Sequence, residues 1–243
     1  MNTDYSRCWA RYRADCDRGM SKEHLLSKSL FPDGIVLASG FEWCKNTERQ
    51  VGINALQRKI LCQKHNNELS VTDEAAKLVI GAFEAGRSAK QLNGLLFERW
   101  LVKTAINLSL GCQHHIGVGM SESEPGKPSP YLIAVAFGNE TLCAKMGAYF
   151  LFPVDKYLYR AGEIFVTPIQ RDMEIGGFLF GLRGQFVFLN LFPGHAPPPI
   201  ATLAPGIVPD QIGAAPLYYR PASFDILNAG GTMERIQLQW THA

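Results

Sequence analysis

The sequence lacks an apolar run of the ~18 residues that a membrane helix requires, so we expect no membrane-spanning segment. Residues 1–5 are polar and lack the apolar stretch of a secretory signal peptide. Internal repeats and low-complexity tracts are also missing. We therefore expect a cytoplasmic protein whose thiols stay reduced.

A strong charge bias is missing too. The net charge is +2, which excludes a globally basic surface. The small excess lies at one end, since residues 1–70 contain eleven Lys and Arg against eight Asp and Glu. This distribution favours a nucleic-acid-binding face near the N-terminus, although an ordinary charged surface would give the same count.

Cysteine is unevenly distributed. Four of the six cysteines fall within the first 62 residues, a segment that is polar and poor in long apolar patterns. In a reducing compartment this clustering indicates metal ligation more than disulfide bonding. The four are Cys8, Cys16, Cys44 and Cys62, whereas Cys112 and Cys143 are predicted to be small buried apolar residues.

The order of the patterns predicts an α+β fold. Residues 1–85 form a small module stabilised by metal, residues 86–118 a helical connector and residues 131–243 a mostly antiparallel β domain. Thr72, followed by two acidic residues, is predicted to cap one helix, and Ser88 to open a second that ends at Gly111. From Tyr131 onward, short apolar runs separated by turn residues predict strands, beginning with 131–137.

Three ordered fragments within residues 21–70 carry the chemistry. The first places Glu23 directly before His24, and the second places Asn54 shortly before the apolar end of a predicted strand. The third is the run Leu-Cys-Gln-Lys-His-Asn-Asn-Glu-Leu-Ser at 61–70. Together, in this order, they resemble the HNH nuclease family, whose ββα-metal fold is a strand hairpin that leads into a helix. The resemblance covers about the first 75 residues.

The resemblance implies a role for each residue. His24 matches the general base that takes a proton from water, a task suited to an imidazole at neutral pH. Glu23 matches the metal-binding acid, a hard oxygen ligand for Mg²⁺ or Mn²⁺. Asn54 would fix the hairpin and orient His24. His24 could instead be a structural histidine.

The last position of the motif has two interpretations. In the first, Cys62 and His65 bind a structural Zn²⁺ and Asn66 is the ligand of the catalytic metal. In the second, no zinc is bound and His65 is itself the final histidine. The first is preferred because Cys62-x-x-His65 has chelate spacing. Cys8 and Cys16 would complete the zinc site, with Cys44 as a competitor, but their wide separation departs from the usual Cys-x-x-Cys pair. Asn66 could also simply cap a helix.

The implied activity is hydrolysis of phosphodiester bonds in nucleic acid, DNA more than RNA, by an endonuclease of the kind found in restriction and phage defence. Basic side chains near the motif are candidates for phosphate contacts: Lys22, Lys28, Arg58, Lys59 and Lys64. The alternative is a zinc-stabilised scaffold that binds a protein or nucleic acid without catalysis. In either case, residues 131–243 could bind a protein partner.

Overall fold

The computed structural model describes residues 4–38, 44, 47, 49–85, 91–111, 128–151, 164–171, 174–183, 185–194, 196–197, 199, 202, 216–227 and 233–241. This part of the chain contains both helices and sheets, and antiparallel strands dominate its C-terminal half. The predicted α+β class and the C-terminal antiparallel sheet are therefore confirmed. Within these ranges, no helix has the length and apolar character needed to cross a membrane.

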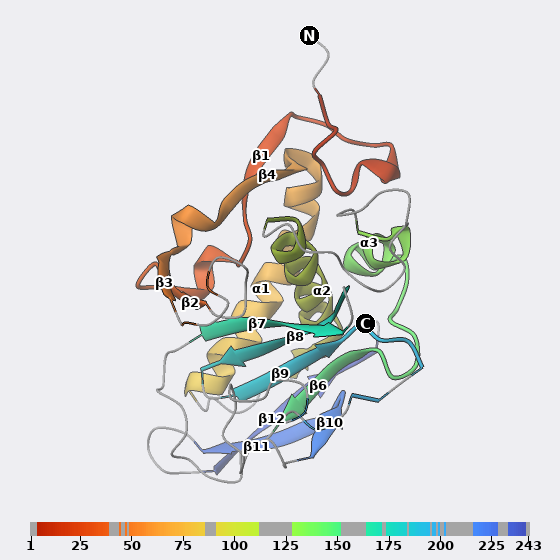
Figure 1. Ribbon diagram of the computed structural model, residues 1–243. Coiled ribbons are helices and arrows are strands. Elements are labelled where there is room, and N and C mark those ends of the chain that lie inside the picture. The colour runs from red at the N-terminus through yellow and green to blue at the C-terminus, as the bar shows by residue number, and fades with distance from the viewer. Residues whose placement is uncertain are drawn as a thin grey trace.

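The N-terminal region is built on a two-stranded hairpin followed by a helix (Figure 1). Strand β1 (Met20–His24) pairs antiparallel with β4 (Gln57–Cys62), and α1 (Gln63–Ala85) begins at the next residue. A short 3-10 helix, η1 (Arg11–Arg13), precedes β1. Between β1 and β4 the chain forms η2 (Lys28–Leu30), β2 (Ile35–Ala38), β3 (Arg49–Gly52) and η4 (Ile53–Leu56).

A seven-stranded sheet joins the two ends of the chain. Its strand order is β10-β6-β9-β8-β7-β2-β3. The C-terminal strands are β6 (Gly147–Leu151), β7 (Ile164–Arg171), β8 (Glu174–Leu182), β9 (Gln185–Asn190) and β10 (Leu217–Tyr219). Strand β2 runs parallel to β7, with Leu37 opposite Phe165. The predicted boundaries at 85 and 131 remain predictions, but residues from both sides of them share this sheet.

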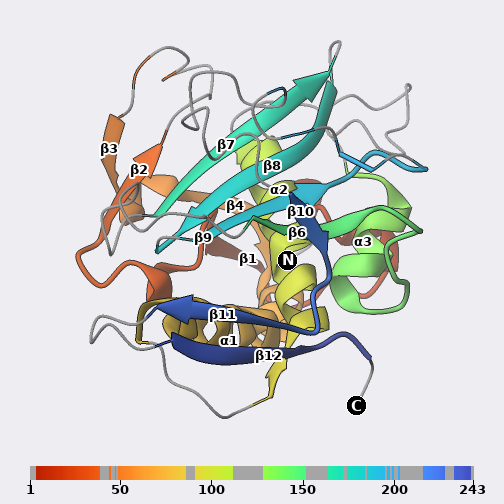
Figure 2. The same cartoon turned by 90° about the horizontal axis from the view of Figure 1, so that it is seen from below.

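Two helices pass from the β1–β4 hairpin to the C-terminal strands. Helix α2 (Gly94–Gly111) lies beside α1 and contacts β6 and β9 (Figures 1 and 2). A three-stranded sheet of β11 (Ser223–Leu227), β12 (Met233–Gln239) and β5 (Leu92–Asn93) completes the architecture. In Figure 2, β11 and β12 lie across α1.

Aromatic side chains fill the space between these helices and sheets. Phe97 stacks on Trp100 at 5.7 Å between ring centroids, and Trp100 lies 6.0 Å from Phe180 of β8. Phe83 of α1 lies 6.5 Å from Phe150 of β6. These rings are buried, so they form the core between the helices and the sheet.

The segment predicted as the first strand of the β region is a helix. Helix α3 (Pro130–Phe137) has Ser129 at its N-cap, where Oγ accepts the backbone N–H of Leu132 at 3.1 Å. Gly138 ends it with φ 81°, a left-handed conformation that favours glycine. The strand prediction was wrong because a short apolar run does not distinguish a strand from a buried helix. In this segment the capping residues at the two ends favour the helix.

Helix starts also differ from prediction. Helix α1 begins nine residues before Thr72, whose hydroxyl donates within the helix to the carbonyl of Leu69 at 2.7 Å. Helix α2 begins at Gly94, where Asn93 Oδ1 accepts the N–H of Leu96 at 2.9 Å. The predicted start at Ser88 lies outside the described residues.

Two cysteines were expected to be small buried residues. Cys143 is exposed, and its sulfur lies 3.1 Å from the hydroxyl of Tyr131. Cys112 lies outside the described residues.

Candidate functional site

Three cysteines and one histidine converge at the base of the hairpin. The donor atoms of Cys8, Cys16, Cys62 and His65 all lie within 4.8 Å of one another. His65 Nδ1 lies 3.4 Å from the sulfur of Cys8, 3.7 Å from that of Cys16 and 3.2 Å from that of Cys62. Three sulfurs and one imidazole nitrogen are a donor set that could hold a metal such as zinc.

Local structure explains why these residues meet. Cys62 ends β4, and His65 lies in the first turn of α1, so a spacing of three places both at one corner. The N-terminal segment lies along β4, where the backbone N–H of Trp9 donates to the carbonyl of Ile60 at 3.0 Å. This contact brings Cys8 close to Cys62. The backbone N–H of Cys62 points at Cys8 Sγ at 3.4 Å. The predicted combination of Cys8, Cys16, Cys62 and His65 is thus brought together.

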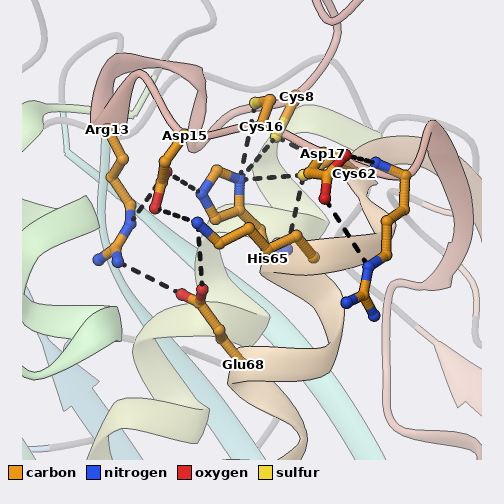
Figure 3. A network of polar contacts seen from close by, with 10 residues as sticks. Cys8, Arg13, Asp15, Cys16, Asp17, Cys62, His65 and Glu68 are labelled. Carbon is orange, nitrogen blue, oxygen red and sulfur yellow. Dashed lines mark hydrogen bonds and ion pairs between the residues drawn. The ribbon is translucent and has the colours of Figure 1, made fainter.

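The second nitrogen of His65 is held by an acid that the motif did not predict. His65 Nε2 lies 2.7 Å from Asp15 Oδ1, and Lys64 Nζ lies 2.6 Å from Asp15 Oδ2 (Figure 3). The hydrogen bond from Lys64 and the proximity of His65 lower the pKa of Asp15 to about 2. A carboxylate in this position fixes the imidazole with Nδ1 towards the sulfurs, as in carboxylate–histidine–zinc arrangements.

Burial raises the pKa of the Cys8 and Cys16 thiols, and at Cys16 the neighbouring Cys8 adds to the effect. Thiolates this close repel one another unless a cation lies between them. A metal ion would therefore bind with release of the thiol protons, and its binding would stabilise the folded state.

Three other predictions near this cluster have a different outcome: Cys44 lies outside it, and His65 and Lys64 are already paired. Cys44 is buried, but it is not a member of the four-residue group. His65 has both ring nitrogens engaged, so it is not available to a second metal. Lys64, expected to contact phosphate, is instead paired with Asp15 and with Glu68 at 3.8 Å.

The predicted base lies at the other end of the hairpin. His24 ends β1 opposite Gln57, and its Nε2 lies 3.4 Å from Asn54 Oδ1. Asn54 reaches this place because η4 turns the chain into β4. The predicted pairing of these two residues is therefore present in the structure.

Gln57 is a third member of this site, and the motif gave no sign of it. Its Nε2 lies 2.7 Å from His24 Nε2. One ring nitrogen cannot donate to Asn54 and accept from Gln57 together, so the proton position selects the partner. With the proton on Nε2, Asn54 accepts it and the Nδ1 lone pair is available to water. With the proton on Nδ1, Gln57 donates to Nε2.

Glu23 is not placed as a metal ligand would be. Its side chain is buried, and Oε1 lies 2.9 Å from Lys103 Nζ of α2. Lys103 also lies 2.8 Å from Asp73 of α1. Burial opposes the charge on Lys103, but the carboxylates of Glu23 and Asp73 outweigh it, so the Lys103 pKa is raised. The expected metal-binding acid is neutralised by an internal cation.

Strand geometry accounts for this difference. Neighbouring residues of a strand point to opposite faces, so when His24 faces outward Glu23 faces α2. Asn107, one turn after Lys103, donates to Glu23 Oε1 and to the His24 carbonyl, both at 3.4 Å. Lys103 and Asn107, two polar residues four apart on α2, are the sequence signal that could have revealed this network.

Asn66 and the basic candidates complete the comparison with prediction. Asn66 is half-buried in the first turn of α1, next to His65. The other four phosphate candidates are exposed: Lys22, Lys28, Arg58 and Lys59. Arg58 Nη1 also donates to the carbonyl of Gln57 at 2.8 Å. Among the described residues, the Cys8–His65 group is the one cluster of three or more His, Cys, Asp or Glu side chains with metal-binding geometry.

Comparison of the chain with protein-family models, with curated protein sequences and with solved structures gives no match. Interpretation of the site therefore depends on its own geometry.

Proposed function

We propose that this protein hydrolyses phosphodiester bonds in nucleic acid, DNA more than RNA, as an HNH-like endonuclease with His24 as general base. The observation that carries the proposal is the contact of His24 Nε2 with Asn54 Oδ1 at 3.4 Å, at the end of the β1–β4 hairpin opposite the Cys8–His65 cluster. The resemblance in the sequence and this geometry agree on the same two residues.

The chemistry requires the tautomer with the proton on Nε2, which Asn54 Oδ1 accepts at 3.4 Å. In that tautomer the Gln57 amide, whose Nε2 lies 2.7 Å from the ring nitrogen, turns its oxygen towards the ring instead. With the proton on Nε2 held by the Asn54 carbonyl oxygen, Nδ1 takes a proton from water as the water oxygen attacks phosphorus. The bond from phosphorus to one sugar oxygen breaks, and that oxygen leaves with a proton taken from solvent. The resulting imidazolium donates to Asn54 through Nε2. Exposed Arg58 and Lys59 follow Gln57 on β4 and can contact the phosphate oxygens of the substrate.

Zn²⁺ fits the Cys8–His65 cluster as a structural ion. Four protein donors close the coordination sphere and leave no position for substrate. The ion would hold residues 8–16 against the corner between β4 and α1. Its contribution is to the fold, since polar N-terminal residues have few apolar side chains to bury.

The residues around Glu23 do not fit a catalytic Mg²⁺ or Mn²⁺ in this arrangement. The carboxylate expected to bind the ion is buried and paired with Lys103, and no step of the mechanism above is assigned to such an ion. Whether cleavage depends on Mg²⁺ or Mn²⁺ is therefore part of the test.

The test is cleavage of plasmid by the purified protein with Mg²⁺, with Mn²⁺ and with neither. We expect nicking or linearisation by the wild type and its loss in His24→Ala, while Lys77→Gln, an exposed change on α1, cuts as the wild type does. Absence of any cleavage that depends on His24 would defeat the proposal.

One observation favours a second candidate, a zinc-stabilised scaffold without catalysis. The burial of Glu23 against Lys103 removes the acid that an HNH metal site uses. The scaffold predicts one tightly bound zinc per chain, no cleavage under any of the three metal conditions, and nucleic-acid or protein binding that is unchanged in His24→Ala.

A further inference from the structure

A basic groove lies beside the proposed site. It has a volume of about 530 Å³ and lies between the N-terminal segment and β4. Arg7 and Arg11 line one wall, and Arg58 and Lys59 line the other. Within the part of the chain that the structure describes, no Asp or Glu is among the residues that line it. Four cations without a facing acid form a surface that attracts a polyanion.

The groove is held in place from both sides. The backbone N–H of Trp9 donates to the Ile60 carbonyl at 3.0 Å, so the N-terminal wall is fixed to β4. Cys8, which also lines the groove, belongs to the Cys8–His65 cluster. A walled site of this kind binds with less loss of conformational entropy than a set of mobile surface lysines.

An aromatic ring lies at the same wall. Tyr12 is 50% exposed. The guanidinium of Arg11 lies 5.2 Å from the Tyr12 ring centroid, and Arg11 Nη1 donates to the Ser6 carbonyl at 2.6 Å. The ring and the cation are thus presented together at the groove.

We infer that this groove binds a single-stranded segment of nucleic acid, with a base stacked on Tyr12 and phosphates between Arg11 and Lys59. Basic grooves that carry an exposed aromatic ring bind single strands, since every base has a face to stack. A pocket of this volume lies in the range that encloses small molecules, so it accepts a short stretch of one strand and excludes a double helix.

The groove also has a defined position relative to His24, the proposed general base. Arg58 directly follows Gln57, the residue opposite His24, so the groove borders the stretch of β4 that carries the proposed site, although neighbouring residues of a strand point to opposite faces. In this respect the inference rests on the proposed function and names its substrate: nucleic acid with an unpaired segment next to the cut. The binding itself does not depend on catalysis.

Binding is measured by fluorescence anisotropy with a labelled oligothymidylate of about ten nucleotides and a blunt duplex of equal length. The protein is the full chain with His24→Ala, without chelator, so that cleavage is silenced and any zinc is retained. We expect the single strand to bind more tightly than the duplex. Tyr12→Leu should weaken single-strand binding roughly tenfold, whereas Tyr12→Phe, which keeps the stacking face, should bind as the parent does.

The contribution of charge to binding is measured from the dependence of the affinity on salt concentration. Lys59→Gln should lower the slope of log affinity against log salt by about 0.7, the value for one phosphate contact on a single strand. Lys77→Gln on the exposed face of α1 is the control and should leave the slope unchanged. Equal binding by Tyr12→Leu and the parent, or tighter binding of the duplex, would overturn the inference.

A cleavage assay beside the binding assay distinguishes failure of this inference from failure of the proposed function. If the wild type cuts in a His24-dependent manner but Tyr12→Leu binds single strands normally, the nuclease stands and the groove assignment falls. If single-strand binding depends on Tyr12 and Lys59 while no variant cuts, the groove assignment stands and the nuclease falls.

Discussion

Replacing Lys103 by methionine tests the buried network that links β1, α1 and α2. The Lys103 and Glu23 side chains are 3% and 8% exposed, and their charged atoms lie 2.9 Å apart. Removing one partner of a buried pair leaves an uncompensated charge and costs about 3–5 kcal/mol. In a chain of this size that lowers Tm by roughly 6–20 °C. Asp73, 26% exposed, regains water more easily, so most of the cost falls on Glu23.

The matched double variant shows whether the reasoning is right. Glu23→Gln in the Lys103→Met background removes the buried carboxylate that has lost its cation. The free energy of unfolding of the double variant, from urea titration, should therefore exceed the sum expected from the two single changes by at least about 1 kcal/mol. Lys77→Met, an exposed change on α1, should stay within about 0.5 kcal/mol of the wild type. Strict additivity of the two single changes would refute the network.

Three further outcomes follow from the structure. Cys16→Ser should abolish stoichiometric zinc in elemental analysis, whereas Cys143→Ser, at an exposed cysteine outside the cluster, should retain it; equal zinc in both would contradict the assigned ligands. Asp15→Asn, which weakens the hold on His65 Nε2, should lower zinc affinity about 10–100-fold in a chelator competition. Ser129→Ala removes the N-cap of α3 and should lower the free energy of unfolding by about 1 kcal/mol, with Ser29→Ala, an exposed serine of η2, as the unaffected comparison.

The Cys62–His65 corner and the pairing of His24 with Asn54 could be predicted from sequence. Cys62 and His65 show chelate spacing, so the local geometry of the chain fixes their approach. His24 and Asn54 are 30 positions apart and meet because β4 returns beside β1. The pairing of Cys8 with Cys16 was less visible, since a 3-10 helix lies between them.

The direction of Glu23 could not be read from its motif. Glu23 follows the strand alternation, but only the position of α2 decides that Lys103 meets it. Nothing in residues 21–70 reports on a lysine about 80 positions later. The same reason explains Gln57, whose role appears only when the register sets it opposite His24.

The apolar run at 131–137 shows another limit. Its composition suits a strand, and its helical state follows from Ser129, Pro130 and Gly138 at its ends. Capping residues placed outside the run carried the information, and attention to apolar content alone missed it.

The parallel pairing of β2 with β7 has a consequence for the order of synthesis. Strand β2 leaves the ribosome roughly 125 residues before β7 does. At about 5–20 residues per second, the nascent β2 edge waits roughly 6–25 s for its partner. The β2–β3 segment, which lies between β1 and β4 in the chain, therefore joins its sheet only after β7 has been translated.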